Sequence, residues 1–450
     1  MKFLAPLLLL LTSTSFASDE NRSHYRLDIV IDAAADIARI SGDWRLPPHQ
    51  DTVRAMQFLL SPLASDPFLK ASCGGAELPI AGVQQTDEGG DRRWSILFRA
   101  ACLPENPLML SFQYEYSGTV AAQLRIARGE GFAGSGGELW YPQESFSELE
   151  TAVITIDTPA GVESVATGDF VDERPEGERV RSRFELRAPG KLAFAYGQYR
   201  IVVRGGSTVW QLARSMDGDL ESLAEAAAKA VAVLADAFGP LPYRDLRIVE
   251  VDFQSQLPGT NELGLLFVDS AQMREAETRM AYWAHELAHQ WWGVSVRPFA
   301  SSPGAAMLTE GMAQYGALLA LERVEGAESA AEYRRNGRGD DTAQSYAGYR
   351  ALVADGGDQP IADFVPQDQA EVLLAQRLAT SKGAIAINGF AERFGHAEFH
   401  AALRAFIERH RGGKASWTDL EAELVRVFGP EAEKYLKTWF HQPGWNGAGS

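Results

Sequence analysis

Apolar and polar side chains alternate along short segments between Tyr25 and about Val203. Clusters of glycine and proline separate these segments, as expected for turns. Alternation with a period of two residues is typical of strands that bury one face. Residues 18–204 are therefore predicted to form an all-β domain, a sandwich or saddle, with strands at 26–32, 51–60, 92–100, 108–118, 151–159, 181–189 and 192–203.

The pattern changes near residue 205, where longer stretches with helical spacing begin. An alanine-rich helix is predicted to end at Gly239 and Pro240, and a strand over 246–253 follows it. We interpret residues 205–450 as a second, mainly helical domain, so the predicted fold class is multidomain α+β. Further helices are expected at 276–293, 304–324, 369–395, 396–410 and 417–429, and residues 334–350 are expected to form a mobile polar loop.

The first residues have the pattern of a secretory signal peptide. Lys2 precedes an apolar run, and Ser15, Phe16 and Ala17 form a small-x-small cleavage signal. We expect residues 1–17 to be removed and the protein to be exported, either to a periplasm or outside the cell. Cys73 and Cys102 are the two cysteines, and an oxidising compartment favours a disulfide between them over two free thiols.

The charge balance narrows the classes of partner. The 450 residues carry 42 basic and 60 acidic side chains, a formal net charge of −18. Nucleic acids and anionic membranes would repel such a chain, and no run of five or six basic residues offers a local exception. We therefore expect no nucleic-acid binding. Since no other uninterrupted apolar stretch approaches the length of a membrane helix, we also expect no stable membrane span after signal cleavage.

The strongest chemical signal is the run His285-Glu286-Leu287-Ala288-His289. Histidines four residues apart on a helix share one face and can bind one metal ion. Glu286 lies beside the first histidine and can act as a general base on water without being a ligand. A catalytic zinc site takes a third protein ligand, and Glu310, on the next helical stretch, is a candidate.

These segments resemble the aminopeptidase N and leukotriene hydrolase family of gluzincin metallopeptidases. The resemblance rests on HELAHQWWG followed by LTEGMAQY, and on the weaker matches WYPQES, LAFAYGQY and FGPLPYRDLRIVEV. It spans roughly residues 24 to 445. It implies a β-saddle followed by a thermolysin-like catalytic domain, in a short form without the large C-terminal helical domain. His285, His289 and Glu310 match the ligands of one zinc ion, and Glu286 matches the general base.

Two family elements are altered in this chain. The family's Gly-x-Met-Glu-Asn loop, whose glutamate binds the amino group of the substrate, corresponds to Gly259-Thr260-Asn261-Glu262-Leu263. Gly259 and Glu262 match as substrate-binding residues, whereas Asn261 replaces the methionine; an exposed loop carboxylate is the alternative interpretation of Glu262.

The family's oxyanion-binding tyrosine corresponds to Thr380, whose hydroxyl has a shorter reach. Loss of an oxyanion donor typically lowers the rate by about 10² to 10³. Tyr346 and Tyr349 are two phenols upstream that could supply a replacement.

The resemblance implies an exported zinc aminopeptidase with peptide substrates. Two alternatives stay open. One is a zinc-binding pseudoenzyme that binds peptide termini or a partner protein without efficient turnover. The other is a zinc hydrolase with a changed substrate, such as an endopeptidase.

Overall fold

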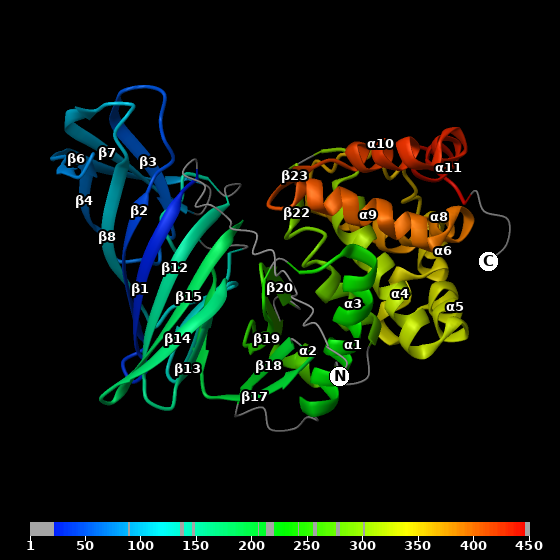
Figure 1. Ribbon diagram of the computed structural model, residues 1–450, viewed down its shortest axis with the longest axis horizontal. Helices are drawn as coiled ribbons and strands as arrows, with labels where there is room; N and C mark the ends of the chain where they lie inside the picture. The colour runs from blue at the N-terminus through cyan, green and yellow to red at the C-terminus, as the bar shows by residue number, and fades with distance from the viewer. Residues whose placement is uncertain are drawn as a thin grey trace, which may run out of the picture.

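The structure of the protein is a computed structural model. It describes residues 22–88, 91–135, 139–145, 149–205, 207–212, 220–241, 243–254, 259–275, 280–299 and 302–445. The predicted leader, residues 1–17, lies outside the described residues. The chain divides into a strand-rich half and a helical half, with a five-stranded sheet between them (Figure 1). The predicted α+β class is confirmed.

Three sheets build the strand-rich half. The largest has eight strands in the order β14-β15-β12-β1-β2-β8-β4-β5, and sheets β3-β7-β6 and β13-β16-β11-β10-β9 accompany it. The strands are β1 (His24–Asp32), β2 (Ile37–Arg45), β3 (Val53–Leu60), β4 (Phe68–Cys73), β5 (Ala76–Glu77), β6 (Ile80–Glu88), β7 (Asp91–Cys102), β8 (Leu108–Ser117), β9 (Val120–Ala121), β10 (Leu124–Ala127), β11 (Glu130–Ala133), β12 (Glu150–Pro159), β13 (Glu163–Ala166), β14 (Asp169–Glu176), β15 (Arg179–Gly190) and β16 (Phe194–Gly197). Burial alternates strictly along β12, as its sequence pattern predicts.

The central sheet has the strand order β17-β18-β19-β21-β20. Its strands are β17 (Tyr199–Arg204), β18 (Ser207–Leu212), β19 (Leu246–Val251), β20 (Gly259–Glu262) and β21 (Leu265–Asp269). Every residue of β19 and β21 is buried. Leu246 and Ile248 join the core of the helical half, whereas Val249 and Val251 join the core of the strand-rich half. The sheet is therefore covered on both faces, which explains its continuous apolar runs.

One predicted strand proves to be two. The segment 192–203 was expected to be continuous, but β16 ends at Gly197 and β17 begins at Tyr199. The two strands belong to different sheets. The chain thus passes from the strand-rich half to the central sheet at residue 198, a few residues before the predicted domain boundary near 205.

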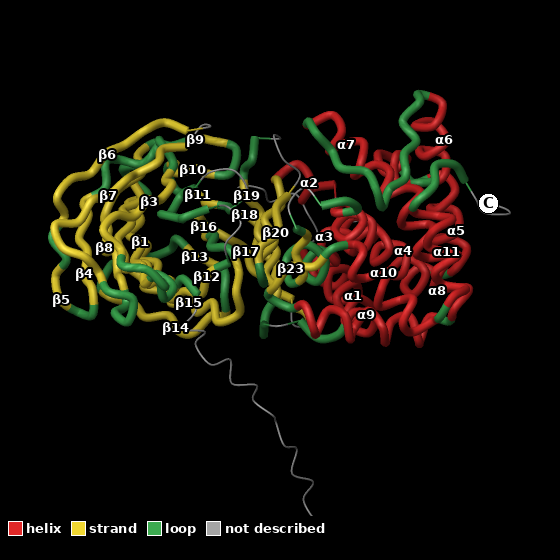
Figure 2. The backbone as a smooth tube through the Cα atoms, turned by 90° about the horizontal axis from the view of Figure 1, so that it is seen from above, coloured by secondary structure: helices red, strands yellow, loops and turns green. Residues whose placement is uncertain are grey.

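Helices pack on the face of the central sheet that points away from the strand-rich half (Figure 2). They are α1 (Leu220–Phe238), α2 (Ser270–Glu275), α3 (Met280–Ala288), α4 (Met312–Glu325), α5 (Ala327–Asn336), α6 (Tyr346–Ala354), α7 (Gln369–Leu378), α8 (Ala384–Phe394), α9 (His396–His410), α10 (Trp417–Phe428) and α11 (Pro430–Phe440). Two π-helical turns, η2 (Met307–Gly311) and η4 (Ala379–Gly383), precede α4 and α8, and β22 (Val296–Pro298) pairs with β23 (Gly413–Ala415). Within the described residues, no helix combines the length and the apolar character needed to cross a membrane.

The prediction of a mobile loop over residues 334–350 is wrong. Helix α5 extends to Asn336, a 3₁₀ turn, η3, spans Gly339–Gln344, and α6 starts at Tyr346. The side chain of Ser345 caps α6 by accepting a hydrogen bond from the backbone N–H of Gly348. A side-chain cap of this kind satisfies one of the free N–H groups of the first helical turn, so this polar stretch encodes a helix start.

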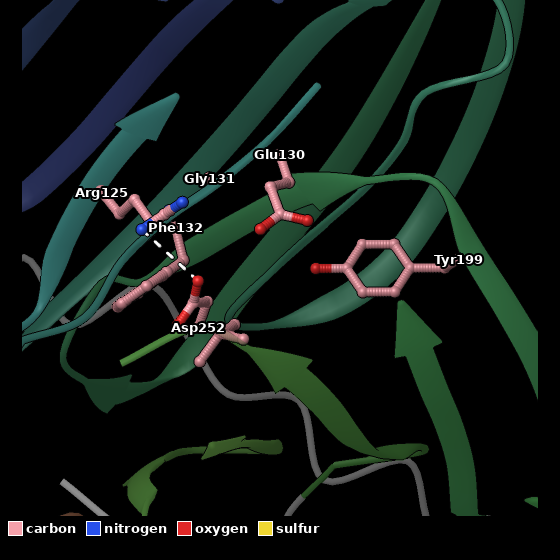
Figure 3. Close-up of a pocket in the computed structure, with 7 residues that line it drawn as sticks. Arg125, Glu130, Gly131, Phe132, Tyr199 and Asp252 are labelled. Atoms are coloured by element: carbon pink, nitrogen blue, oxygen red, sulfur yellow. Dashed lines mark ion pairs between the residues drawn. The ribbon is translucent and has the colours of Figure 1, made fainter. Parts of the chain in front are cut away.

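A small hollow marks the contact between the strand-rich half and the central sheet (Figure 3). Arg125, on β10, forms an ion pair with Asp252, which directly follows β19, at 3.4 Å. Tyr199 and Glu130 also line this hollow. None of the predicted metal- or substrate-binding residues lines it. We interpret it as part of the joint between the two halves.

Candidate metal centre

Helix α3 and the turn after it present the two histidines. His285 lies in the last turn of α3, and His289 directly follows the last helical residue, Ala288. The chain closes this turn with a backbone hydrogen bond from the N–H of Trp292 to the carbonyl oxygen of Ala288. The apolar neighbours Trp283 and Leu287 are fully buried and fix the helix in the core. The two imidazole rings therefore lie close together, with centroids 4.9 Å apart.

Glu310 reaches the same place from the π-helical turn η2. Its Oε2 atom lies 3.3 Å from Nε2 of His285 and 3.8 Å from Nε2 of His289. Ligands at about 2.0–2.2 Å from a tetrahedral zinc ion are separated by about 3.3–3.6 Å. Potential ligand atoms of the three side chains all lie within 4.8 Å of one another. Their spacing therefore fits one zinc ion without large movement.

The π-helical turn that carries Glu310 packs closely against the second π-helical turn. A Cβ atom at Gly383, on η4, would collide with the side chain of Met307, on η2. A Cβ atom at Gly311 would also meet Met307, and would approach the carbonyl oxygen of Ala379 to 3.3 Å. The two π-helical turns are therefore held together through Met307. Such turns are rare and often occur at functional sites.

The second nitrogen of each imidazole has a hydrogen-bond partner. Nδ1 of His285 lies 2.8 Å from Oε1 of Gln314, and Nδ1 of His289 lies 3.1 Å from the carbonyl oxygen of Trp292. Since a carbonyl oxygen only accepts, Nδ1 of His289 carries a proton, and Nε2 is the nitrogen that faces the metal-binding group. Outer partners of this kind orient metal-binding histidines. Gln314 follows Glu310 by four residues on the same helical run, a spacing that could have identified it from the sequence.

The electrostatics of the three side chains are strongly coupled in the absence of metal. Burial lowers the pKa of His285, but the hydrogen bond to Glu310 and its charge outweigh burial and raise that pKa to about 9. Burial raises the pKa of Glu310, but the charge of His289 and the hydrogen bond to His285 lower it to about 2. This pairing of a carboxylate with imidazoles is what a divalent cation would replace.

Glu286 points toward the edge strand of the central sheet. It is half-buried, and its Oε2 atom accepts a hydrogen bond from Nδ2 of Asn261 at 3.3 Å. Asn261 lies on β20, which also carries Gly259 and Glu262. The general-base candidate therefore lies beside the strand that carries the two substrate-binding candidates.

Glu262 is not an exposed loop carboxylate. Its exposed fraction is 2%, and its Oε1 atom accepts a hydrogen bond from the hydroxyl of Ser135. Among the described residues, the buried Oε2 atom has no hydrogen-bond partner. Burial raises the pKa of Glu262, an effect that the charge of Arg297 and the Ser135 hydrogen bond oppose. A buried carboxylate with a free oxygen is a suitable acceptor for a charged donor.

The hydroxyls of Thr380 and Tyr349 donate hydrogen bonds to groups outside the metal-binding group. Thr380, on η4, donates a hydrogen bond to the carbonyl oxygen of Gln376 at 3.0 Å. Tyr349 is buried and donates to Oδ2 of Asp358 at 3.0 Å. Tyr346 packs its ring against Trp445, with centroids 4.5 Å apart. Among the described residues, these contacts of Tyr346 and Tyr349 do not place either side chain beside the metal-binding group.

Comparison with known proteins agrees with this geometry. Residues 260–439 match the peptidase family M1 domain. A variant of the M1 zinc metallopeptidase from Deinococcus radiodurans is similar at 18% identity over 94% of this chain and 95% of that one, with a TM-score of 0.67. The same variant bound to a Tyr-Ser-Ala substrate gives 19% identity over 94% of this chain and 93% of that one, with a TM-score of 0.67.

Yeast leukotriene A4 hydrolase is also similar. It shares 14% identity over 95% of this chain and 68% of its own length, with a TM-score of 0.70. No curated protein matches the sequence. At these identities the solved structures establish the fold, and the domain match covers residues 260–439, the segment that contains the predicted metal ligands. This chain carries a peptidase family M1 domain at residues 260–439 and shares the two-domain fold of M1 zinc metallopeptidases.

Proposed function

We propose that this protein is an exported zinc aminopeptidase that removes amino-terminal residues from peptides. The observation that carries the proposal is the convergence of His285, His289 and Glu310, with Glu286 adjacent to the first histidine. Three ligands leave one coordination position open, as in catalytic rather than structural zinc sites. Peptides are the expected substrates because the domain match is to a peptidase family.

The chain's own residues supply the acid–base chemistry. When bound here, zinc polarises the scissile carbonyl and lowers the pKa of a coordinated water to about 7. Glu286 accepts a proton from the attacking water as the water oxygen bonds to the carbonyl carbon. It then gives this proton to the departing amine as the C–N bond breaks. The partner of its Nδ1 atom orients each of His285 and His289, so that Nε2 is the nitrogen that would bind the metal.

Glu262 supports the assignment as an aminopeptidase. Among the described residues its buried Oε2 atom has no partner, and Asn261, the preceding residue of β20, contacts Glu286. A substrate ammonium group would form a charge-assisted hydrogen bond to this oxygen. A carboxylate at a fixed distance from the general base selects the first peptide bond of a substrate, which is the property of an exopeptidase.

Two features support export. The sequence of residues 1–17 has the pattern of a signal peptide. Cys73 and Cys102 form a disulfide bond, which persists in oxidising compartments such as a periplasm or the extracellular space.

Thr380 favours a second candidate function. Its hydroxyl is bound to the backbone of its own helix, so the position of the family's oxyanion donor presents no phenol. A protein with the zinc ligands but without that donor could bind peptide termini with little turnover. The presence of Glu286 argues for turnover, since binding alone does not need a general base.

One experiment separates these functions. The zinc-loaded protein is given an aminoacyl nitroanilide with a free amino group and the same compound with an acetylated amino group. We expect turnover of the free-amine substrate only, and a loss in kcat/KM of about 10- to 100-fold in Glu262→Gln, which keeps the Ser135 contact but removes the charge. Equal cleavage of both substrates would indicate an endopeptidase-like hydrolase. Peptide binding without cleavage of either would indicate the binding protein.

A further inference from the structure

We infer that Asn261 is a positioning residue for Glu286, because its side-chain amide fixes one oxygen of the general-base carboxylate. This inference rests on the proposed function. Asn261 stands where the resemblance has methionine, a residue that cannot donate a hydrogen bond. The hydrogen bond from Asn261 to Glu286 is therefore a feature of this chain that the family's methionine could not form.

The placement follows from strand geometry. β20 is the edge strand of the central sheet and pairs antiparallel with β21, with Asn261 opposite Leu266 and Glu262 opposite Leu265. Consecutive residues of a strand face opposite sides of a sheet. Leu266 belongs to the core of the helical half and Leu265 to the core of the strand-rich half. Asn261 therefore faces α3 and Glu286, whereas Glu262 faces the strand-rich half and Ser135.

Gln290 determines which atoms of Asn261 face Glu286. Oε1 of Gln290 accepts two hydrogen bonds, from the hydroxyl of Tyr243 at 2.7 Å and from the backbone N–H of Gly264 at 3.0 Å. On its other side, Nε2 of Gln290 donates to the backbone carbonyl oxygen of Glu262 at 3.0 Å. The N–H of Gly264 can only donate and this carbonyl can only accept. These two backbone groups leave Gln290 one amide orientation.

The orientation of Asn261 follows from that of Gln290. Nε2 of Gln290 donates to Oδ1 of Asn261 at 2.8 Å, so Oδ1 is the acceptor and Nδ2 is on the opposite side. Nδ2 then donates to Oε2 of Glu286 at 3.3 Å. The backbone of β20 thus controls, through two amides, that a donor rather than an acceptor faces the general base. Gln290 is fully buried, which stabilises this arrangement.

Asn261 therefore determines which carboxylate oxygen of Glu286 accepts the proton. With Oε2 held by Asn261, the other oxygen of Glu286 is available to the attacking water. A hydrogen bond to a charged group is worth more than one between neutral groups, and misorientation of a general base lowers the rate of proton transfer. Asn261 acts through Glu286, so its loss should change kcat rather than KM.

Two substitutions of similar size test this role. Asn261→Leu removes the donor, and we expect kcat to fall about tenfold with KM within about twofold of the wild-type value. Asn261→Asp keeps the shape and still accepts from Gln290, but it places a carboxylate against Glu286. We expect kcat to fall about 100-fold or more in this variant, because like charges at this distance repel. A purely structural role predicts the reverse order, with the isosteric aspartate milder than leucine.

Gln290→Glu provides an independent variant. A glutamate still accepts from Tyr243 and Gly264, but it no longer donates to Asn261. We expect Asn261 to turn its Nδ2 atom toward residue 290 and to present an acceptor to Glu286, with a fall in kcat of about tenfold. Zinc content, measured in every variant, should equal that of the wild type.

The outcomes distinguish this inference from the proposed function. If the wild-type protein turns over substrate and both Asn261 variants match it, the positioning role is wrong and the aminopeptidase proposal stands. If the wild type has no activity, the proposed function is wrong, and crystal structures of the zinc-loaded wild type and Asn261→Leu decide the positioning role. A carboxylate of Glu286 that rotates only in the variant supports that role, and an unchanged carboxylate refutes it.

Discussion

The disulfide bond between Cys73 and Cys102 allows a quantitative prediction. Cys73 is the last residue of β4 in the eight-stranded sheet, and Cys102 is the last residue of β7 in the three-stranded sheet, so the bond joins two sheets. The two cysteines are 29 residues apart in sequence. Closing a loop of this length restricts the unfolded chain, and the loop-entropy relation gives about 3.6 kcal/mol at 25 °C. Reduction of the bond should therefore destabilise the strand-rich half by about this amount.

Hydrogen exchange followed by mass spectrometry reports this effect locally. We expect the protection of amides in β7 and β8 to fall by about 400-fold after reduction, which is the same free energy expressed as an equilibrium constant. Peptides from α9 should not change, since α9 packs in the core of the helical half. The variant with both Cys73→Ser and Cys102→Ser is the matched control, because reductant should have no effect on it.

The same experiment makes a functional prediction. β4 and β7 lie at the end of the strand-rich half that is remote from α3 (Figure 1). Reduction should therefore leave peptidase activity intact at temperatures where the strand-rich half remains folded. A change in protection of less than about threefold in β7 would refute the loop-entropy reasoning. Loss of activity without loss of protection would contradict the separation between the disulfide and the site.

The remaining predictions concern the metal centre. Gln314→Leu removes the partner of Nδ1 of His285 and should weaken zinc affinity about 10- to 100-fold, measured by competition with a chelator. Metal-free protein should be stabilised by protonated His285 below the unfolded pKa of about 6.5, and should lose this contribution as pH rises through about 9. The contribution of ionised Glu310 should be present above about 4.5 and be lost as pH falls toward about 2. Urea unfolding at pH 6 and pH 9.5 tests the first window, and Glu310→Gln, which removes the partner charge, should flatten it.

The sequence predicted the parts of the site that depend on local spacing. Two histidines four residues apart need only a helix to meet, and α3 with its closing turn provides one. Alternation along the N-terminal segments predicted the strands because one face of each is buried. The resemblance followed from the same motif, and residues 260–439, which contain that motif, match the peptidase family M1 domain.

Other features depend on tertiary contacts that spacing does not encode. The break between β16 and β17 arises because adjacent residues enter different sheets. The contact between the two π-helical turns depends on the packing of Met307 against Gly311 and Gly383, which are far apart in sequence. The interaction of Asn261 with Glu286 requires an edge strand and a helix to meet, and its direction depends on Gln290. A replaced methionine was visible in the sequence, but its new partner was not.

We propose that Glu286 is the general base of a zinc peptidase whose metal is held by His285, His289 and Glu310. The most direct test measures zinc content and release of the amino-terminal residue in the same preparations of wild-type protein and Glu286→Gln. We predict equal zinc content, near one ion per chain, and a loss of activity of at least about 10³-fold in the variant. A variant that binds zinc and keeps full activity would contradict the account.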